Sequence, residues 1–284
     1  MELAVLSGKG GTGKTTIATA LAELAEDVIR VDCDVDAPNL YLFYKGKDIE
    51  KTDFIGGKKA IIDELLCVKC GKCETICRFH AVENFKINPF ICEGCGACRL
   101  VCPQNAIKLE DEKTADTFIT ELDKGIISRA EMEVGSDGSG KLITYLRKNG
   151  RRFNKDEKLI IIDGSPGIGC SVISSITGSN TVLIVTEPTK SGLEDLMRVV
   201  SLCEHFGVFT MVCINKHDIN KEVTKDIENF INEKGLKLVG KIPYDDIVMK
   251  SINELKPITY YKDSIAEKAI EEMWNKIKNT IKNC

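Results

Sequence analysis

Eight cysteines between residues 67 and 102 have the spacing of metal ligands. They form two copies of C-x2-C-x2-C-x3-C, namely Cys67, Cys70, Cys73 and Cys77, then Cys92, Cys95, Cys98 and Cys102. In such runs three closely spaced thiolates bind one iron–sulfur cubane, and the fourth cysteine binds the other. The spacing therefore predicts two 4Fe-4S clusters. One set of ligands is Cys67, Cys70, Cys73 and Cys102, and the other is Cys77, Cys92, Cys95 and Cys98.

The two motifs form an internal repeat of about 25 residues, and residues 58–112 resemble bacterial two-cluster ferredoxins. One departure is that Arg78 follows the first motif where Pro103 follows the second. This changes the local turn but removes no ligand. Two structural zinc sites are the alternative, although zinc sites rarely combine three cysteines at this spacing with a fourth close behind.

A second chemical signal lies near the N-terminus. An apolar run at residues 1–6, expected to be a buried strand, leads into the pattern G-x-x-x-x-G-K-[ST], and residues 17–24 are expected to be helical. This is the pattern of a phosphate-binding loop, in which Lys14 reaches the β and γ phosphates and the Thr15 hydroxyl binds magnesium. The predicted nucleotide-binding residues are Gly8, Lys9, Gly10, Gly11, Thr12, Gly13, Lys14, Thr15 and Thr16.

Carboxylates follow two further apolar runs. Asp32, Asp34 and Asp36 follow the run at 27–31, and Asp163 follows the run at 158–162 and precedes a glycine loop that ends at Gly167. At the ends of parallel strands such groups hold magnesium or orient a water molecule. An ordinary surface turn is the alternative for the first group.

The elements that must position these residues alternate between strand and helix. Further strands are expected at 181–186 and 209–215, and Asn215 and Pro243 lie in candidate base-recognition loops. The alternation predicts an α/β fold with a doubly wound, mostly parallel sheet, interrupted by an α+β ferredoxin-like insert. The expected boundaries are 1–57 and 113–284 for the nucleotide-binding domain and 58–112 for the insert.

The glycine loop with Lys9, the Asp32-x-Asp34 pair and the segment 163–167 together resemble the MinD/Mrp group of P-loop ATPases, over residues 1–50 and about 155–284. The resemblance implies a nucleotide-sandwich dimer with ATP and Mg²⁺. Ser165 departs from it, because many members have proline there. The implied roles are dimer-crossing phosphate contact for Lys9, water positioning for Asp34, magnesium binding for Asp163, γ-phosphate sensing for Gly167 and adenine recognition for Asn215.

Composition narrows the function classes. The chain has 284 residues with a net charge of −4, which disfavours a general nucleic-acid coat, and no apolar run approaches membrane-spanning length. A cytoplasmic location is therefore expected. The helical apolar stripe at 265–281 is expected to pack on the sheet, with membrane binding as the alternative. The turn-rich segment 133–141 is expected to be an ordinary loop, with an interdomain hinge as the alternative.

Five cysteines lie outside the two motifs, and one of them is the last residue, Cys284. Cys33, Cys203 and Cys213 are expected in the core. Cys170 is interpreted as a small buried thiol, with a labile cluster ligand as the alternative.

Taken together, the motifs predict a dimeric ATPase that couples a nucleotide switch to electron transfer or to metallocluster maturation on a client metalloprotein. The dimer partner is an identical or a related chain. The alternatives are an ATP-dependent Fe-S cluster carrier, with Cys170 as its transfer site, and a ParA/MinD-like positioning ATPase, which leaves the eight cysteines unexplained.

Overall fold

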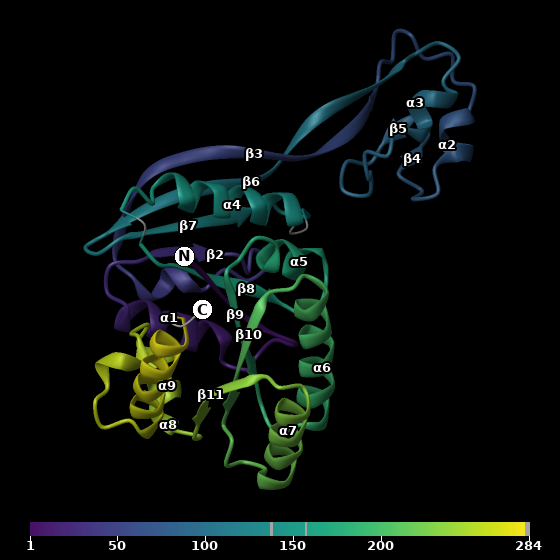
Figure 1. Ribbon diagram of the computed structural model, residues 1–284. Coiled ribbons are helices and arrows are strands. Elements are labelled where there is room, and N and C mark those ends of the chain that lie inside the picture. Colours follow the sequence, from purple (N-terminus) through teal and green to yellow (C-terminus); the bar gives the residue numbers. More distant parts are fainter. Residues whose placement is uncertain (137–138, 157, 282–284) are drawn as a thin grey trace. The chain divides into compact units, whose positions relative to one another are not determined.

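The computed structural model describes residues 1–136, 139–156 and 158–281 (Figure 1). The chain forms two compact units. The first comprises Met1–Lys51, Thr117–Glu131 and the chain from residue 138 onward, and the second comprises Thr52–Asp116 and Met132–Asp137, apart from the undescribed positions. All eight cysteines of the two motifs fall in the second unit, as does the segment 58–112. The undescribed residues 137–138 belong to the turn-rich segment for which a loop was expected.

The first unit is built on a sheet with the strand order β11-β10-β9-β1-β8-β2-β7-β6-β3. The pairs from β11 through β1, β8 and β2 to β7 are all parallel, which confirms the predicted mostly parallel α/β fold. The strands are β1 (Glu2–Ser7), β2 (Ile29–Asp32), β3 (Gly46–Ile62), β6 (Ile107–Leu122), β7 (Ile126–Met132), β8 (Ile160–Pro166), β9 (Thr181–Thr186), β10 (Phe209–Asn215) and β11 (Lys237–Ile242).

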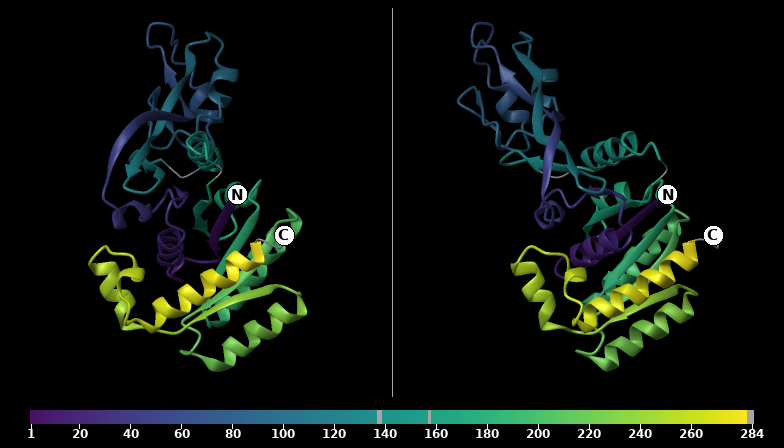
Figure 2. Two further views of the ribbon diagram at one scale, coloured as in Figure 1. Left: turned by 60° about the vertical axis from the view of Figure 1, so that its left-hand side comes forward. Right: turned by 90° about the vertical axis from the view of Figure 1, so that its left-hand side faces the viewer.

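Both faces of the central strands are covered by helices because these strands are apolar on both sides. Helices α1 (Lys14–Leu24), α8 (Asp246–Asn253) and α9 (Ile265–Ile281) pack on one face. Figures 1 and 2 show the other four helices along the opposite face. These are α4 (Gly140–Arg152), α5 (Cys170–Ile176), α6 (Lys190–His205) and α7 (Lys221–Glu233), and two short 3₁₀ turns lie at Leu40–Phe43 and Ile258–Tyr260.

The apolar stripe of α9 is part of the core, as expected from its periodicity. Ile270, Met273, Trp274 and Ile277 are buried among residues of α1 and the central strands. The stripe is therefore not available as a membrane-binding face. Within the described part of the chain, no helix combines the length and apolar character needed to cross a membrane.

The second unit has a repeated backbone. Its elements are α2 (Lys72–Ile76), α3 (Ala97–Val101) and a small antiparallel pair of β4 (Val82–Glu83) and β5 (Lys86–Ile87). The amide of Asp63 donates to the Ala106 carbonyl, and the amide of Asn88 donates to the Ala81 carbonyl, each at 2.7 Å. The two bonds are related by an offset of 25 residues, since 88 − 63 and 106 − 81 are both 25.

Sequence patterns missed strands β3, β6 and β7. These strands extend the sheet beyond β2, and β3 and β6 continue past Lys51 and Thr117 into the second unit. The residues of β3 carry charges on both faces and are mostly exposed or half-buried, so neither an apolar run nor a clean alternation marks the strand.

Arg147 of α4 anchors this helix to α5 and β1. It is buried, and its guanidinium donates hydrogen bonds to the carboxylate of Glu2 and to the carbonyls of Ser174 and Thr177. Arg152 lies on the same helix but is half exposed and pairs with Glu50 at the surface.

We expect Arg147→Ala to lower the free energy of unfolding by about 3–5 kcal/mol, because it leaves the buried Glu2 carboxylate with reduced pairing. Arg152→Ala is the control and should cost less than about 1 kcal/mol. The single tryptophan, Trp274, lies in the core of this unit, so urea unfolding followed by its fluorescence makes the measurement. Equal losses in the two variants would contradict the assigned role of Arg147.

Candidate functional site

The glycine loop connects β1 to α1 at the carboxyl edge of the sheet. Gly11 and Gly13 adopt left-handed backbone conformations, with φ of 80° and 90°. Gly8 is required for a different reason, since a Cβ at this position would lie 2.3 Å from Cβ of Asp195 in α6. The loop can thus curl at the N-terminus of α1 while lying directly against α6, which suits it to surround phosphate oxygens.

Lys14 is buried at the centre of the site between two strand-end carboxylates. Its ammonium lies 2.7 Å from Oδ1 of Asp163 and 3.2 Å from Oδ2 of Asp34. Burial acts to lower the pKa of Lys14, but the charges of Asp163 and Asp34 outweigh it and hold the pKa above its ordinary value. The structure therefore brings together three predicted site residues that lie up to 149 positions apart in the chain.

Asp32 and Asp163 lie side by side because β2 and β8 pair in register. Burial and, after it, the charge of Asp163 raise the pKa of Asp32 to about 8. Burial also raises the pKa of Asp34 and outweighs the opposing effect of Lys14. Three carboxyl groups thus lie close together, and a divalent cation bound among them would stabilise their charged forms.

One oxygen in this group lacks a partner. Oδ2 of Asp163 is buried and accepts no hydrogen bond from the described residues. A buried carboxylate oxygen that is left unpaired is costly unless a ligand or water satisfies it. Asp163, together with Thr15 at the start of α1, therefore suits a hydrated magnesium ion bound beside a nucleotide.

The segment that follows β2 is hydrogen-bonded to the end of β8. The amide of Cys33 donates to the Asp163 carbonyl at 2.8 Å, and the Ser165 hydroxyl donates to the Cys33 carbonyl at 2.6 Å. Gly167 has φ of 97° and donates its amide to the carbonyl of Ser7. The segment 163–167 is thus held against both β1 and the segment that carries Asp34.

Lys9 turns away from Lys14 and is held within its own chain. Its ammonium lies 2.9 Å from the Glu187 carboxylate and donates to the hydroxyls of Thr189 and Ser191. Burial acts to raise the pKa of Glu187, but the hydrogen bond from Lys9 and the charge of Lys216 hold it below its ordinary value. Sequence reasoning missed Glu187, since nothing in its surroundings marks it as a lysine partner.

Asn215 and Pro243 lie near each other because they end the paired strands β10 and β11. Asn215 is opposite Ile242, the residue before Pro243. The Asn215 amide nitrogen donates to the Thr12 carbonyl at 2.8 Å, so this side chain touches the glycine loop itself. The structure therefore brings Asn215 to the glycine loop, and Pro243 follows the residue paired with Asn215 on the neighbouring strand.

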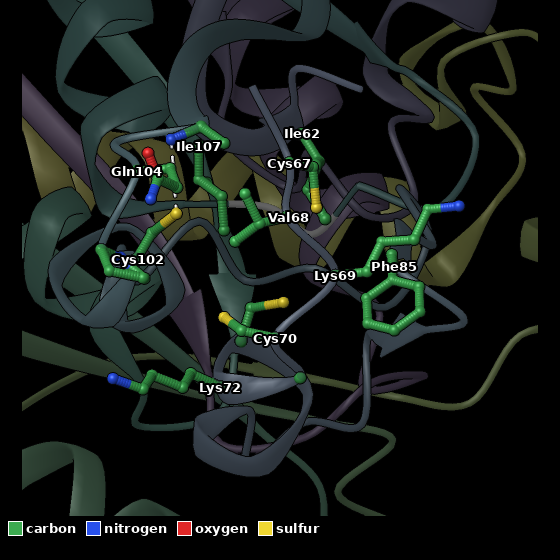
Figure 3. Close-up of a pocket in the computed structure, with 14 residues that line it drawn as sticks. Ile62, Cys67, Val68, Lys69, Cys70, Lys72, Phe85, Cys102, Gln104 and Ile107 are labelled. Atoms are coloured by element: carbon green, nitrogen blue, oxygen red, sulfur yellow. Dashed lines mark hydrogen bonds between the residues drawn. The ribbon is translucent and has the colours of Figure 1, made fainter. Parts of the chain in front are cut away.

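The first predicted set of four cysteines surrounds a cavity in the second unit. Cys67, Cys70, Cys73 and Cys102 line a small cavity of about 20 Å³. Figure 3 shows Cys67, Cys70 and Cys102 on its walls beside apolar residues such as Val68 and Ile107. Burial raises the pKa of the Cys73 thiol.

The second set lines a similar cavity, also of about 20 Å³. Its cysteines are Cys77, Cys92, Cys95 and Cys98. The amides of Ala81 and Ala106 each donate to a cysteine sulfur, Cys77 and Cys102 respectively, at 3.3 Å. Hydrogen bonds to sulfur from the backbone stabilise thiolate ligands of iron–sulfur clusters.

The described residues contain no group of three or more His, Cys, Asp or Glu side chains close enough to hold a single metal ion. Each cysteine set instead lies around a space. Four thiols spread over the walls of an apolar cavity match the donor set that a four-iron cubane requires.

The interpretation of Cys170 as a buried thiol is wrong. Cys170 begins α5 and is exposed, because the glycine-rich turn before it carries the chain to the surface. Cys33, Cys203 and Cys213 are buried as expected. Burial raises the pKa of the Cys203 thiol to about 11, which makes this cysteine unreactive.

Comparison with known proteins matches most of the chain to one family. Residues 3–258 match the CobQ/CobB/MinD/ParA nucleotide binding domain. Two proteins of Methanocaldococcus jannaschii are similar over the whole length. The uncharacterized protein MJ0578 is 37% identical over 99% of this chain and 98% of its own. The uncharacterized ATP-binding protein MJ0823 is 33% identical over 99% of this chain and 100% of its own.

Similarity to MinD proteins is more distant. The septum site-determining protein MinD of Bacillus subtilis is 23% identical over 90% of this chain and 81% of its own. Among solved structures, MinD of Pyrococcus horikoshii in complex with Mg-ADP has a TM-score of 0.59 at 18% identity, covering 97% of this chain and 95% of that one. This structural likeness concerns the fold.

We expect Gly8→Ala to lower the free energy of unfolding by about 1–3 kcal/mol, because the added methyl group must displace the glycine loop from α6. Gly10→Ala is the matched control. No atom of the described residues lies within 4 Å of a Cβ at Gly10, so the change should stay within about 0.5 kcal/mol. Thermal unfolding without nucleotide makes the measurement, and an unaffected Gly8→Ala variant would contradict the close approach.

Proposed function

Because the chain belongs to the CobQ/CobB/MinD/ParA family of nucleotide-binding domains, we propose that it is an ATP-hydrolysing iron–sulfur protein. Its nucleotide-driven dimer switch is coupled to electron transfer to a partner protein, or to metallocluster maturation on that partner. The observation that carries the proposal is the pair of cavities, each lined by one predicted set of four cysteines, in a chain of this ATPase family.

The glycine loop binds the phosphates of ATP in this proposal. Lys14 exchanges its contacts with Asp163 and Asp34 for phosphate oxygens, and Asp163 and Thr15 hold the hydrated magnesium ion. Asp34 is then free to position the attacking water. Asn215 and Pro243 contact the adenine. Similarity to the ATP-binding protein MJ0823 and to the Mg-ADP complex of the Pyrococcus horikoshii MinD supports nucleotide as the ligand.

Dimer formation requires Lys9 to leave Glu187. In the single chain the ammonium is occupied by three partners within its own protomer. ATP in a dimer offers a more highly charged partner, namely the phosphates bound by the other protomer. Exchange of Lys9 between these partners would make the nucleotide-bound state favour association.

The ferredoxin-like insert carries the second half of the proposal. The repeated backbone, the two apolar cavities and the amide-to-sulfur hydrogen bonds support two 4Fe-4S clusters. When bound, such clusters supply single electrons at a potential set by their surroundings. The protein supplies the thiolates, the hydrogen bonds and the apolar walls that limit access of water.

Two other functions have supporting observations. The named MinD relatives favour a positioning ATPase, and that function needs no cysteine motifs. The exposed thiol of Cys170 favours an ATP-dependent cluster carrier that hands a cluster to a client. The iron content of the purified protein distinguishes the positioning ATPase from our proposal. A Cys170→Ala variant that loses cluster transfer but keeps electron delivery would favour the second.

We expect anaerobically purified protein to contain about eight irons and eight sulfides per chain. Cys73→Ser should lose about half of the iron because it removes a ligand of one cluster. Cys203→Ser is the control, since it changes a buried core thiol outside the motifs, and should keep all of it. Iron and sulfide assays make the measurement, and zinc in place of iron would overturn the cluster assignment.

The same preparation tests the coupling. Electron paramagnetic resonance of the dithionite-reduced protein should change when a nonhydrolysable ATP analogue replaces ADP. A full complement of iron with a spectrum indifferent to nucleotide would argue against nucleotide-gated electron transfer and for the carrier function. Absence of iron would favour the positioning function.

We expect Asp34→Asn to slow ATP hydrolysis about 100-fold or more while ATP binding is retained. The variant keeps a side chain of the same size but removes negative charge beside the phosphates. It should therefore accumulate as an ATP-bound dimer in size-exclusion chromatography. Asp36→Asn, at an exposed carboxylate two residues away, should hydrolyse ATP normally. Equal rates in the two variants would remove Asp34 from the mechanism.

A further inference from the structure

We infer that Ser165 is a positioning residue for ATP hydrolysis, and that its hydroxyl holds the peptide bond from which Asp34 projects. The inference rests on the proposed ATPase function and adds a residue to its mechanism. The side chain of Ser165 is buried, with only 3% of its surface exposed to solvent. It therefore acts through Asp34 and not on the nucleotide.

The Ser165 hydroxyl reaches the segment of Asp34 through a short hydrogen bond. Its Oγ donates to the carbonyl oxygen of Cys33 at 2.6 Å. Cys33 is completely buried, and its amide donates to the Asp163 carbonyl at 2.8 Å. Both backbone groups of Cys33 are thus bonded to the β8 segment that carries Asp163.

The far side of the same peptide bond is also held. The Cys33 carbonyl and the Asp34 amide belong to one planar peptide unit. While Ser165 binds the carbonyl, the Asp34 amide donates to Oδ1 of Asp32 at 3.2 Å. A peptide unit fixed at both ends leaves Asp34 its side-chain rotations but little freedom of its Cα.

A side-chain hydroxyl is needed at position 165 for this contact. Proline, which many proteins of the resembled group have at this position, has no hydroxyl to donate across to β2. The Ser165 hydroxyl therefore adds a second hydrogen bond between β8 and the segment after β2, besides the bond from the Cys33 amide to the Asp163 carbonyl. A shift of the segment 163–167 would carry the Asp34 peptide with it.

Loss of the hydroxyl should affect the hydrolytic step more than ATP binding. Binding depends on the glycine loop and Lys14, whereas the Ser165 hydroxyl is hydrogen-bonded to the Cys33 carbonyl. Hydrolysis depends on the placement of Asp34, and small misplacement of a catalytic group slows a reaction about ten- to a hundredfold. A lower kcat with little change in KM is the pattern expected for an interaction that matters in the transition state.

The test compares three variants of the full-length, cluster-loaded protein. Ser165→Ala removes the hydroxyl and Ser165→Thr retains one. Ser175→Ala is the matched control, because Ser175 is also fully buried and donates to a backbone carbonyl, that of Ser171 within its own helix. Each is measured for kcat and KM in ATP hydrolysis, for ATP affinity by calorimetry and for melting temperature.

Ser165→Ala should lower kcat about tenfold or more with KM and ATP affinity within about twofold, and Ser165→Thr should recover most of the rate. Ser175→Ala should lower the melting temperature by a similar amount but leave kcat unchanged. If both alanine variants lose stability and neither loses kcat, the positioning role is overturned. If the wild-type protein binds ATP but does not hydrolyse it, the proposed function itself fails, and the inference with it.

Discussion

The nucleotide site depends on one buried cation placed among carboxylates. Lys14 is 6% exposed, and its ammonium forms ion pairs with the carboxylates of Asp163 and Asp34. Removing either partner from such a group is costly, because the remaining charge stays buried. In the proposed mechanism, phosphate oxygens of ATP take the place of these carboxylates as partners of Lys14.

Much of this site follows from the sequence because its residues end strands. In a parallel sheet the carboxyl ends meet at one edge, so an apolar run followed by an aspartate predicts where Asp34 and Asp163 lie. The cysteine spacing likewise limits which thiols can lie around one space. Cys102 lines the same cavity as Cys67, Cys70 and Cys73 in the structure, while the assignment of these residues as cluster ligands stays a prediction.

Features that depend on distant contacts could not be predicted from local patterns. Glu187 meets Lys9 only because α6 begins beside the glycine loop, and no spacing in the sequence encodes that approach. Strand β3 carries charge on both faces, so periodicity could not reveal it. Cys170 was expected to be buried, whereas the structure exposes it at the start of α5.

The chain passes from the sheet of the first unit into the cysteine-bearing unit. Strand β2, which ends at Asp32, pairs in parallel with β7, with Ile29 opposite Ile126 and Val31 opposite Ser128. The last residue of β7, Met132, belongs to the cysteine-bearing unit. Parallel strand pairing therefore joins β2, the strand that leads to Asp34, to a strand whose last residue belongs to the cysteine-bearing unit.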